Sequence, residues 1–599
     1  MSALIYRLMP HSAHRLRIRL QIASAGEKLQ CYLPIWIPGS YTRRDFSRYL
    51  NILKVENNGK TVAWQLENPS AWSAQGEAGD WLVEYEVYAR DYSVRGCYLD
   101  DVRAMINPAC ACLAVRGAEQ AEHHLIWQPD ESRRDWHSAG AIPSADNQWQ
   151  FDDYQTLIDT PLMFARDLLR CEFEAGGIRH EIAVCGHHGQ EDDIALKLLD
   201  NDIADICRNT IAQFGGLPED VPFYSFLLFL TENGYGGLEH QRSTLLISSR
   251  EAFSHGNKQS YIQLLNLFSH EYFHTWNVKS LRPKAYAKGY ELEHEHISDM
   301  LWLFEGFTAY FDSLILLRAN TIDKAQYLRL FSQDISRHLQ RQGQHYQTLA
   351  RSSLESWTKL YNGGENAPNI STNYYIHGAL AAWCIDAYLH RYSLDRQGLD
   401  QRLAEIWQQA AYRAQGIDEA DFIRHAQSRL PPERQAEFAD FIRRLIHECD
   451  YLPLEFAAET FGLRLKYYAP PQEANAIGNH QLTAVTEAGI RWQEQQGKFY
   501  VRLNDPDSPA AKAGIAANDE IIAVCGEQAN AANLWRRLMR GSGGETVSIH
   551  ILRDGLHHEY SWKLRLANYD TAWLSIDEQA ENEAADRRRQ WWRTRSAKR

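Results

Sequence analysis

The sequence lacks the features that mark membrane-spanning and disulfide-stabilised proteins. No apolar run in its 599 residues approaches the roughly 20 residues needed to cross a bilayer. The N-terminus lacks a charged segment followed by a sustained apolar one, so no secretory signal is indicated and we expect a cytoplasmic protein. The ten cysteines are scattered, and their one close pair, Cys110 and Cys112, has no second pair at zinc-finger spacing. We therefore expect reduced, mostly buried thiols.

An excess of positive charge is also missing. The net charge of −14 argues against a general nucleic-acid binder, and we expect no nucleic-acid or membrane partner. Residues 587–599 are a local exception, with seven basic residues and no acidic one. Such a tail could contact membrane or RNA, but the sequence favours a solvated tail or one docked on the rest of the chain.

The pattern of apolar residues predicts a multidomain α+β protein. Residues 1–168 alternate short β-rich runs with turns, which predicts an N-terminal antiparallel β domain. Residues 169–462 form a mixed α/β lobe followed by a helical lobe. Residues 463–570 return to β character, and residues 571–599 form a basic C-terminal tail. The chain is too long for a single hydrophobic core, which agrees with several domains.

One short motif carries the strongest chemical signal. His270, Glu271 and His274 form an HExxH pattern inside an apolar run. Residues four apart lie on one face of a helix, so both imidazoles can bind one Zn²⁺ ion while the Glu reaches a water molecule beside it. The same pattern occurs in unrelated helices, where such a His is a hydrogen-bonded core residue. With its context, the motif predicts a zinc hydrolase.

A catalytic zinc ion needs a third protein ligand. A metzincin would have Gly at 277 and His at 280, but Asn277 and Ser280 stand there. Of two later carboxylates, Glu293 has the spacing from His274 that is familiar from gluzincin aminopeptidases, although its charged neighbours indicate a solvated loop. Glu305 interrupts an apolar helix, where a carboxylate is costly unless a metal or cation compensates it. We therefore predict Glu305 as the ligand.

A second metal site is a weaker possibility in the same region. His294 and His296 lie in the charged stretch around Glu293 and could bind another ion. The sequence favours surface histidines as the explanation.

The residues around the HExxH motif carry a family resemblance. Segments 276–279, 282–283 and 302–310 closely resemble the glycyl aminopeptidase family of metallopeptidases, which is distantly similar to the aminopeptidase N family. Segments 36–41 and 43–46 resemble the N-terminal β domain of that family. The likeness covers most of the chain. It implies a thermolysin-like catalytic domain with one Zn²⁺ per chain.

The resemblance also implies how a peptide is bound. Residues 233–240 follow a predicted strand and, read alone, form a glycine-rich turn with an exposed Glu. They look like the substrate-binding glycine motif of both aminopeptidase families. This makes Glu239 the implied anchor of the peptide's α-ammonium group and places Gly236 and Gly237 along its backbone.

A donor to the developing oxyanion is implied in the same way. Segment 373–378 is similar to the segment that supplies a catalytic Tyr in the aminopeptidase N family, and alignment on Gly378 selects Tyr375 rather than Tyr374. His377 stands where those relatives have Lys, which leaves its role open. Glu271 is the implied general base, which later returns the proton to the leaving amine.

The C-terminal β region resembles a PDZ domain. Segments 507–514 and 518–526 match the signature in which a Ser-Pro-Ala turn leads to a short helix and a strand. PDZ domains bind peptide C-termini by adding a strand. The carboxylate-binding loop is weakly represented, with residues 488–492 as the nearest candidate, so a structural or oligomerising role is equally compatible with the sequence.

Together these features predict a zinc-dependent aminopeptidase, and the family resemblance implies that it removes small N-terminal residues, Gly or Ala, from peptides. Two alternatives remain. A gluzincin endopeptidase or amidase would use the same metal site without binding an amine at Glu239. A scaffold would act through the PDZ-like region and retain a vestigial metal site.

Overall fold

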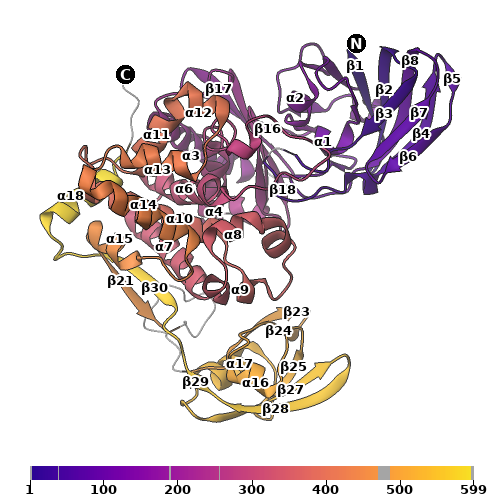
Figure 1. The fold of residues 1–599 in the computed structure, drawn as a ribbon. Coiled ribbons are helices and arrows are strands. Elements are labelled where there is room, and N and C mark those ends of the chain that lie inside the picture. Colours follow the sequence, from indigo (N-terminus) through magenta and orange to yellow (C-terminus); the bar gives the residue numbers. More distant parts are fainter. Residues whose placement is uncertain (1–2, 38, 188–190, 255–256, 470–485, 595–599) are drawn as a thin grey trace.

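The computed structural model describes residues 3–37, 39–187, 191–254, 257–469 and 486–594. An N-terminal β domain, a central domain of mixed sheet and helices, and a small C-terminal β domain follow one another along the chain (Figure 1). The predicted multidomain α+β class is confirmed.

The N-terminal domain is built on a seven-stranded sheet with the order β14-β12-β1-β2-β8-β4-β5. Strands β2 (Arg15–Ala25) and β8 (Gly79–Tyr88) pair antiparallel at its centre, with Ile18 opposite Tyr85, and alternate side chains are buried. One pairing departs from the predicted antiparallel pattern, because β1 (Leu4–Ser12) is parallel to β12 (His123–Trp127). A long connection separates these two strands, so no hairpin fixes their direction.

The remaining strands of this domain complete the large sheet and form two smaller ones. The large sheet also contains β4 (Leu50–Asn57), β5 (Lys60–Thr61) and β14 (Gln148–Phe151). The smaller sheets contain β3 (Lys28–Tyr32), β6 (Trp64–Asn68), β7 (Ala71–Gln75), β9 (Tyr98–Leu99), β10 (Arg103–Ile106), β11 (Ala114–Val115), β13 (His137–Ala139) and β15 (Leu162–Ala165).

The central domain begins with a five-stranded sheet of order β16-β17-β18-β20-β19. Its strands are β16 (Leu169–Ala175), β17 (Ile178–Cys185), β18 (Phe223–Thr231), β19 (Gly236–Glu239) and β20 (Ser243–Ser249). Helix α3 (Glu191–Phe214) connects the parallel pair β17 and β18. Every residue of β18 is buried, as expected for a strand covered on both faces. The edge strand β19 runs antiparallel and ends at Glu239.

The helices after this sheet include those that carry the predicted site. Helix α4 (Lys258–Phe273) is capped by the Asn257 side chain and packs against α6 (Gly306–Arg318). The short helix α5 (Leu301–Phe304) leads into α6 through Glu305, and α7 (Lys324–Leu339) and α10 (Tyr374–Tyr392) follow. The remaining helices of this lobe are α8 (Leu349–Leu354), α9 (Ala367–Ile370), α11 (Leu399–Gln408), α12 (Ala410–Gln415), α13 (Glu419–Gln427), α14 (Pro432–His447) and α15 (Leu454–Thr460).

A pair of glycines brings two of these helices into backbone contact. A Cβ added to Gly306 would lie 2.6 Å from the Cα of Gly378, and one added to Gly378 would lie 2.8 Å from the Cα of Gly306. Any larger residue at either position would push α10 away from the α5–α6 junction. Glu305 and Tyr375 lie next to this contact in sequence, so the glycine pair sets the distance between the segments that carry them.

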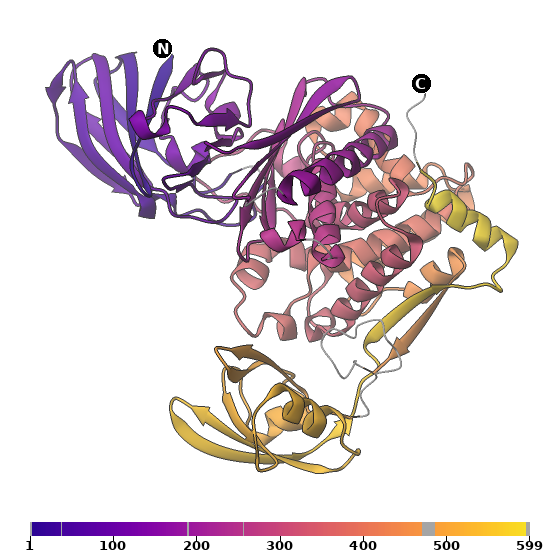
Figure 2. The ribbon, with the colours of Figure 1, turned by 180° about the vertical axis from the view of Figure 1, so that it is seen from behind.

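The C-terminal β domain is inserted between two paired strands. Strand β21 (Leu463–Tyr468) pairs antiparallel with β30 (Thr571–Ile576), and β30 packs on α7. Between them lie β23 (Ile490–Gln495), β24 (Lys498–Asn504) and the strands and helices that complete the domain around a core of its own. Figures 1 and 2 show this domain apart from the central domain. The completing elements are α16 (Pro509–Ala513), β25 (Glu520–Val524), α17 (Ala531–Met539), β27 (Thr546–Arg553) and β28 (Leu556–Lys563).

After the C-terminal β domain, the chain returns to the central domain. Helix α18 (Asn582–Trp591) buries Trp591 completely, and the Trp591 carbonyl accepts a hydrogen bond from Arg318 on α6 at 2.8 Å. The basic tail is therefore docked over its described part, while residues 595–599 lie outside the described residues.

The last two features concern disulfide bonds and membrane-spanning helices. All ten cysteines lie in the described part of the chain, and none is paired with another. A search of the described helices finds no candidate for a membrane span.

Candidate active site

The two histidines of the HExxH motif converge as helical spacing predicts. His270 lies in the last turn of α4, and His274 directly follows the helix. The Nε2 atoms of His270 and His274 lie 3.3 and 3.4 Å from Oε2 of Glu305. The ligand atoms of these three residues all lie within 4.8 Å of one another. Two imidazole nitrogens and one carboxylate, with room for a further ligand, are the donor set of a catalytic zinc site.

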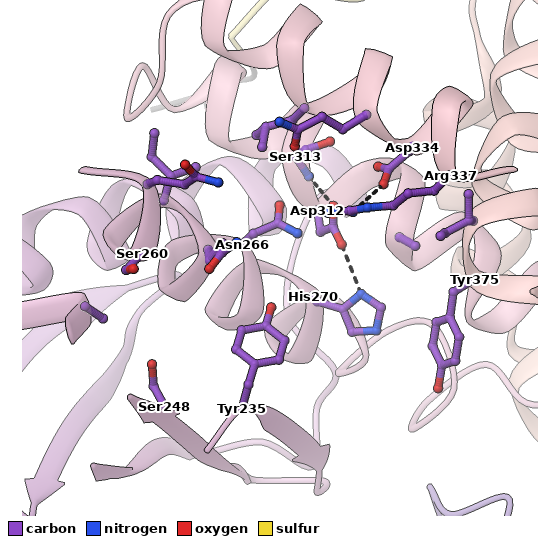
Figure 3. Close-up of a pocket in the computed structure, with 18 of the residues that line it drawn as sticks. Tyr235, Ser248, Ser260, Asn266, His270, Asp312, Ser313, Asp334, Arg337 and Tyr375 are labelled. Atoms are coloured by element: carbon purple, nitrogen blue, oxygen red, sulfur yellow. Dashed lines mark hydrogen bonds and ion pairs between the residues drawn. The ribbon is translucent and has the colours of Figure 1, made fainter. Parts of the chain in front are cut away.

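Each imidazole is oriented by a hydrogen bond on its other nitrogen. Nδ1 of His270 lies 3.1 Å from Oδ2 of Asp312 on α6, and Nδ1 of His274 lies 2.8 Å from the carbonyl oxygen of Asn277. These acceptors hold both Nδ1 atoms protonated and leave both Nε2 lone pairs directed at the common point. Figure 3 shows the contact between Asp312 and His270.

Glu305 is held by a residue from a different domain. The hydroxyl of Tyr41, in the N-terminal domain, donates a hydrogen bond of 2.6 Å to Oε1 of Glu305, which leaves Oε2 facing the histidines. Glu305 is 2 % exposed. Glu293 is elsewhere, where it forms a bidentate ion pair with Arg116 at 2.6 and 3.2 Å. The structure brings Glu305, and not Glu293, to the histidines.

Two further carboxylates are buried beside this set without a hydrogen-bond donor. In the described part of the chain, nothing donates to Oε2 of Glu271 or to Oε1 of Glu239. Both side chains are tightly enclosed, because a Cβ on Gly237 would lie 2.2 Å from Oε1 of Glu271 and one on Gly39 would lie 2.4 Å from Oε1 of Glu239. An unpaired buried carboxylate is costly, so these two oxygens are positioned to bind something that the chain does not supply.

The glycines near Glu239 and Glu271 are required for different reasons. Gly236 has φ of +151°, a conformation that favours glycine, and Gly39 has φ of +74° in the N-terminal domain. Gly237 needs its missing side chain because Glu271 fills that space. The predicted glycines on β19 therefore lie against the motif helix, beside Glu239.

The charges of the site are strongly coupled. Burial opposes protonation of His274, but Glu305 and Glu239 raise its pKa to about 9. Burial also raises the pKa of Glu239 to about 8, despite the opposing influence of His274. His274 and His270 outweigh the effect of burial on Glu305 and hold its pKa well below its usual range. Glu305 and Glu239 thus place negative charge beside the histidines, and a bound dication would balance that charge.

Tyr375 lies next to the histidines at the start of α10. Its ring centroid is 6.1 Å from that of His270, and its hydroxyl is 2.7 Å from that of Tyr361. Tyr374 also contacts the Tyr361 hydroxyl, at 3.0 Å, but its side chain is fully buried. The two neighbours therefore differ, because Tyr375 lines the cavity beside His270 and Tyr374 does not. Figure 3 shows Tyr375 and Tyr235 on opposite sides of His270.

Three other histidines lie outside the metal-type cluster. His296 accepts a hydrogen bond from the backbone of Glu291, and neither it nor His294 belongs to a ligand group found among the described residues. His377 is buried and contacts Thr372 at 3.1 Å, and its ring is tilted against that of His338 with the centroids 4.5 Å apart. Burial lowers the pKa of His377 to about 4, so it is a neutral core residue near neutral pH.

Sequence reasoning missed three positioning residues, Tyr41, Asp312 and Asn277. Asp312 left a weak signal, because it is an acidic residue in an apolar helix two turns after Glu305. In the sequence, Asn277 serves only to exclude the metzincin pattern. Tyr41 carried no local signal of this contact, because 264 residues separate it from Glu305.

A cavity of about 630 Å³ adjoins the site, and His270, Asp312 and Tyr375 form part of its wall. Figure 3 shows these residues together with Asp334 and Arg337 on the neighbouring helix. Glu239 is not among the residues that line this cavity.

Comparisons with known proteins agree with this arrangement. Residues 7–166 match the Peptidase M61 N-terminal domain, residues 263–381 match M61 glycyl aminopeptidase, and residues 487–564 match a PDZ domain. A crystal structure of an aminopeptidase N family protein from Idiomarina loihiensis is 30% identical, covers 98% of this chain and 100% of that chain, and has a TM-score of 0.90.

Two further similarities are more limited. An M1 zinc metallopeptidase from Deinococcus radiodurans is 14% identical over 76% of this chain and 95% of that chain, with a TM-score of 0.45. The carboxy-terminal processing protease CtpB of Bacillus subtilis is 29% identical over 102 residues, which are 17% of this chain. The chain spans about a fifth (21%) of the length of that curated relative.

Proposed function

Because this chain belongs to the M61 glycyl aminopeptidase family, and is therefore a peptidase, we propose that it is a zinc aminopeptidase that removes a small N-terminal residue, Gly or Ala, from peptides. His270, His274 and Glu305 would hold one Zn²⁺ ion. The observation that carries the proposal is the pair of buried carboxylates beside that ligand set, Glu239 and Glu271, each with one oxygen to which no described residue donates a hydrogen bond.

Glu239 fits the role of amine anchor. Its carboxylate is buried, and the α-ammonium group of a peptide would donate to Oε1, which has no hydrogen-bond donor among the described residues. An anchor beside the ligand set fixes the register of the peptide, so that the first peptide bond is the one presented for hydrolysis. Close packing of the Gly39 segment over Glu239 leaves little space there, which supports a small N-terminal residue.

Glu271 fits the role of proton carrier. When bound, the zinc ion would lower the pKa of a water molecule and polarise the scissile carbonyl. Glu271 would accept the proton of the attacking water and later give it to the leaving amine. Burial raises the pKa of Glu271, which suits a group that must first accept a proton and then release it.

Tyr375 fits the role of oxyanion donor. Its ring lies near that of His270, and its hydroxyl contacts that of Tyr361. Burial raises the pKa of Tyr375 well above its usual range, so the O–H group remains a donor at neutral pH. The hydrogen bond between the hydroxyls of Tyr361 and Tyr375 would orient the Tyr375 hydroxyl.

The test compares peptides with a free and a blocked N-terminus. We expect Gly- and Ala-peptides to be cleaved after their first residue, with the N-acetylated forms resistant because they carry no ammonium group for Glu239. Equal cleavage of the acetylated peptides would contradict the aminopeptidase assignment and favour an endopeptidase. Removal of metal by a chelator should abolish activity, and added zinc should restore it.

For the PDZ domain, we propose a separate peptide-binding role. Strand β23 is an edge strand, and Trp492 on it lies 5.2 Å from Trp535 on α17, measured between ring centroids. A peptide C-terminus could add to this edge, beside the aromatic pair. Tryptophan fluorescence during titration with C-terminal peptides tests this role, and an unchanged spectrum with all of them would count against it.

A further inference from the structure

The cavity beside His270 is elongated, and its two ends can be identified from the helices that form its wall. The ring centroids of His338 and His377 are 4.5 Å apart, so the end of α7 lies beside the start of α10, where Tyr375 is. Arg329 also lines the cavity, eight residues before Arg337 on α7. At 1.5 Å per residue, Arg329 is roughly 12 Å farther along the helix from the active-site end.

Helix α4 also extends from one end of the cavity to the other. Gln259 and Ser260 line the cavity from the first turn of α4, whereas His270 is in its last turn. About ten residues of helix separate them, or roughly 15 Å. One end of the cavity is therefore formed by His270 and Tyr375, and the other end by Arg329 and the start of α4.

The far end is polar and carries an available positive charge. Arg337 is paired with Asp334 at 3.0 Å (Figure 3). Arg329 is exposed, and no carboxylate in the described parts of the chain lies within ion-pair distance of it. In a protein with a net charge of −14, an unpaired guanidinium at the end of a cavity from the active site is well placed to bind an anion.

We propose that this cavity holds the leaving part of the peptide substrate and that Arg329 pairs with its C-terminal carboxylate. The inference rests on the proposed aminopeptidase function, which places the amine at Glu239, outside the cavity. An extended peptide spans 3.3 to 3.6 Å per residue, so the roughly 12 Å along α7, shortened by the reach of the arginine side chain, fits two or three residues. The favoured substrates are thus tripeptides and tetrapeptides with a free C-terminus. The cavity volume of about 630 Å³ lies in the range of sites for ligands of this size.

The experiment varies the C-terminus and leaves the N-terminus unchanged. For the wild type, kcat/KM for Ala-Ala-Ala and Ala-Ala-Ala-Ala should exceed that for the C-terminally amidated forms by about tenfold. Arg329→Gln should raise KM for the free peptides about tenfold and remove this difference, while Arg329→Lys retains most of it. Hydrolysis of alanine p-nitroanilide, which has no leaving peptide, should be unchanged in both variants.

Controls separate this proposal from the one on which it rests. Lys324→Gln removes a positive charge from the same helix outside the cavity and should change none of these values. Equal values of kcat/KM for free and amidated peptides in the wild type would overturn the assignment of Arg329. So would an Arg329→Gln variant that loses as much activity on alanine p-nitroanilide as on the free peptides. Failure of the wild type to cleave alanine p-nitroanilide would instead overturn the aminopeptidase function, and this inference with it.

Discussion

The candidate active site and the PDZ domain are assembled in opposite ways. The site combines Tyr41 of the N-terminal domain, Glu239 at the edge of the mixed sheet and residues of α4, α6 and α10. The PDZ domain is one continuous segment with its own hydrophobic core, inserted between β21 and β30. Accurate packing between domains is therefore a requirement for the site, whereas the PDZ domain can be altered independently of it.

A buried ionic cluster strengthens the contact on which the site depends. Asp159, at the end of the N-terminal domain, accepts hydrogen bonds from Lys279 at 2.9 Å and from His240 at 3.0 Å. Lys279 and His240 overcome the effect of burial and hold the pKa of Asp159 below its usual range. His240 directly follows Glu239 in the chain. The N-terminal domain thus contacts the site at both Glu305 and the segment of Glu239.

The largest effect is expected within the site itself. Glu271→Gln keeps the size of the side chain but removes the proton acceptor, so kcat should fall about 10³-fold on Ala-peptides. Zinc content should remain that of the wild type, because Glu271 is not among the three proposed ligands. Steady-state kinetics combined with metal analysis checks both statements. A variant with more than a tenth of wild-type kcat would remove Glu271 from the mechanism.

The next effect tests the contribution of the N-terminal domain. Tyr41→Phe deletes the hydrogen bond to Glu305 and should weaken zinc binding by about 10- to 100-fold, as loss of an orienting partner commonly does. Competition with a chelator measures the affinity. Tyr32→Phe is the matched control, because it removes another Tyr–Glu hydrogen bond of the same domain away from the site. Equal zinc affinities in the two variants would show that the interdomain contact does not hold the ligand.

A smaller effect is expected at the contact between α10 and the α5–α6 junction. Gly378→Ala places a methyl group 2.8 Å from both the Cα of Gly306 and the carbonyl oxygen of Trp302, so unfolding free energy should fall by up to about 3 kcal/mol. Gly26→Ala is the control, because its added methyl group meets nothing within 4 Å. Denaturant unfolding gives both values. Similar unfolding free energies of the two variants would mean that α10 can move away from the α5–α6 junction without loss of stability.

The smallest effect is expected from removing the PDZ domain. Tyr468 and Thr571 are paired residues of β21 and β30, so a short Asn-Gly turn can replace residues 469–570. Activity on alanine p-nitroanilide should stay within about twofold of the wild type, because the described site residues all lie outside this segment. A large loss of activity in a folded variant would show that the active site depends on the PDZ domain.

The same contrast explains what could be predicted from the sequence. The convergence of His270 and His274 follows from helical spacing, and Glu305 could be selected because a carboxylate in an apolar helix needs a partner. Those features are local in sequence. The PDZ domain is also local, since its helix and strand signature lies within one segment.

Long-range contacts were beyond that reasoning. Tyr41 meets Glu305 only after two domains pack, and the glycines at 306 and 378 acquire meaning only once two helices cross there. The insertion of the PDZ domain into the β21–β30 pair was missed for the same reason, since short strands separated by about a hundred residues carry no signal of their pairing. Tyr375 and Glu239 were selected through family resemblance, because a Tyr among thirty and a Glu after glycines have no distinctive local pattern.

The most direct test of the account is a crystal structure of the zinc-loaded protein with anomalous scattering recorded at the zinc edge. We predict one zinc ion per chain, bound at about 2.0–2.2 Å by Nε2 of His270, Nε2 of His274 and a carboxylate oxygen of Glu305. Glu305→Gln should lose the peak, and Glu293→Gln should retain it. A zinc peak beside Glu293, or none near the two histidines, would contradict the central claim.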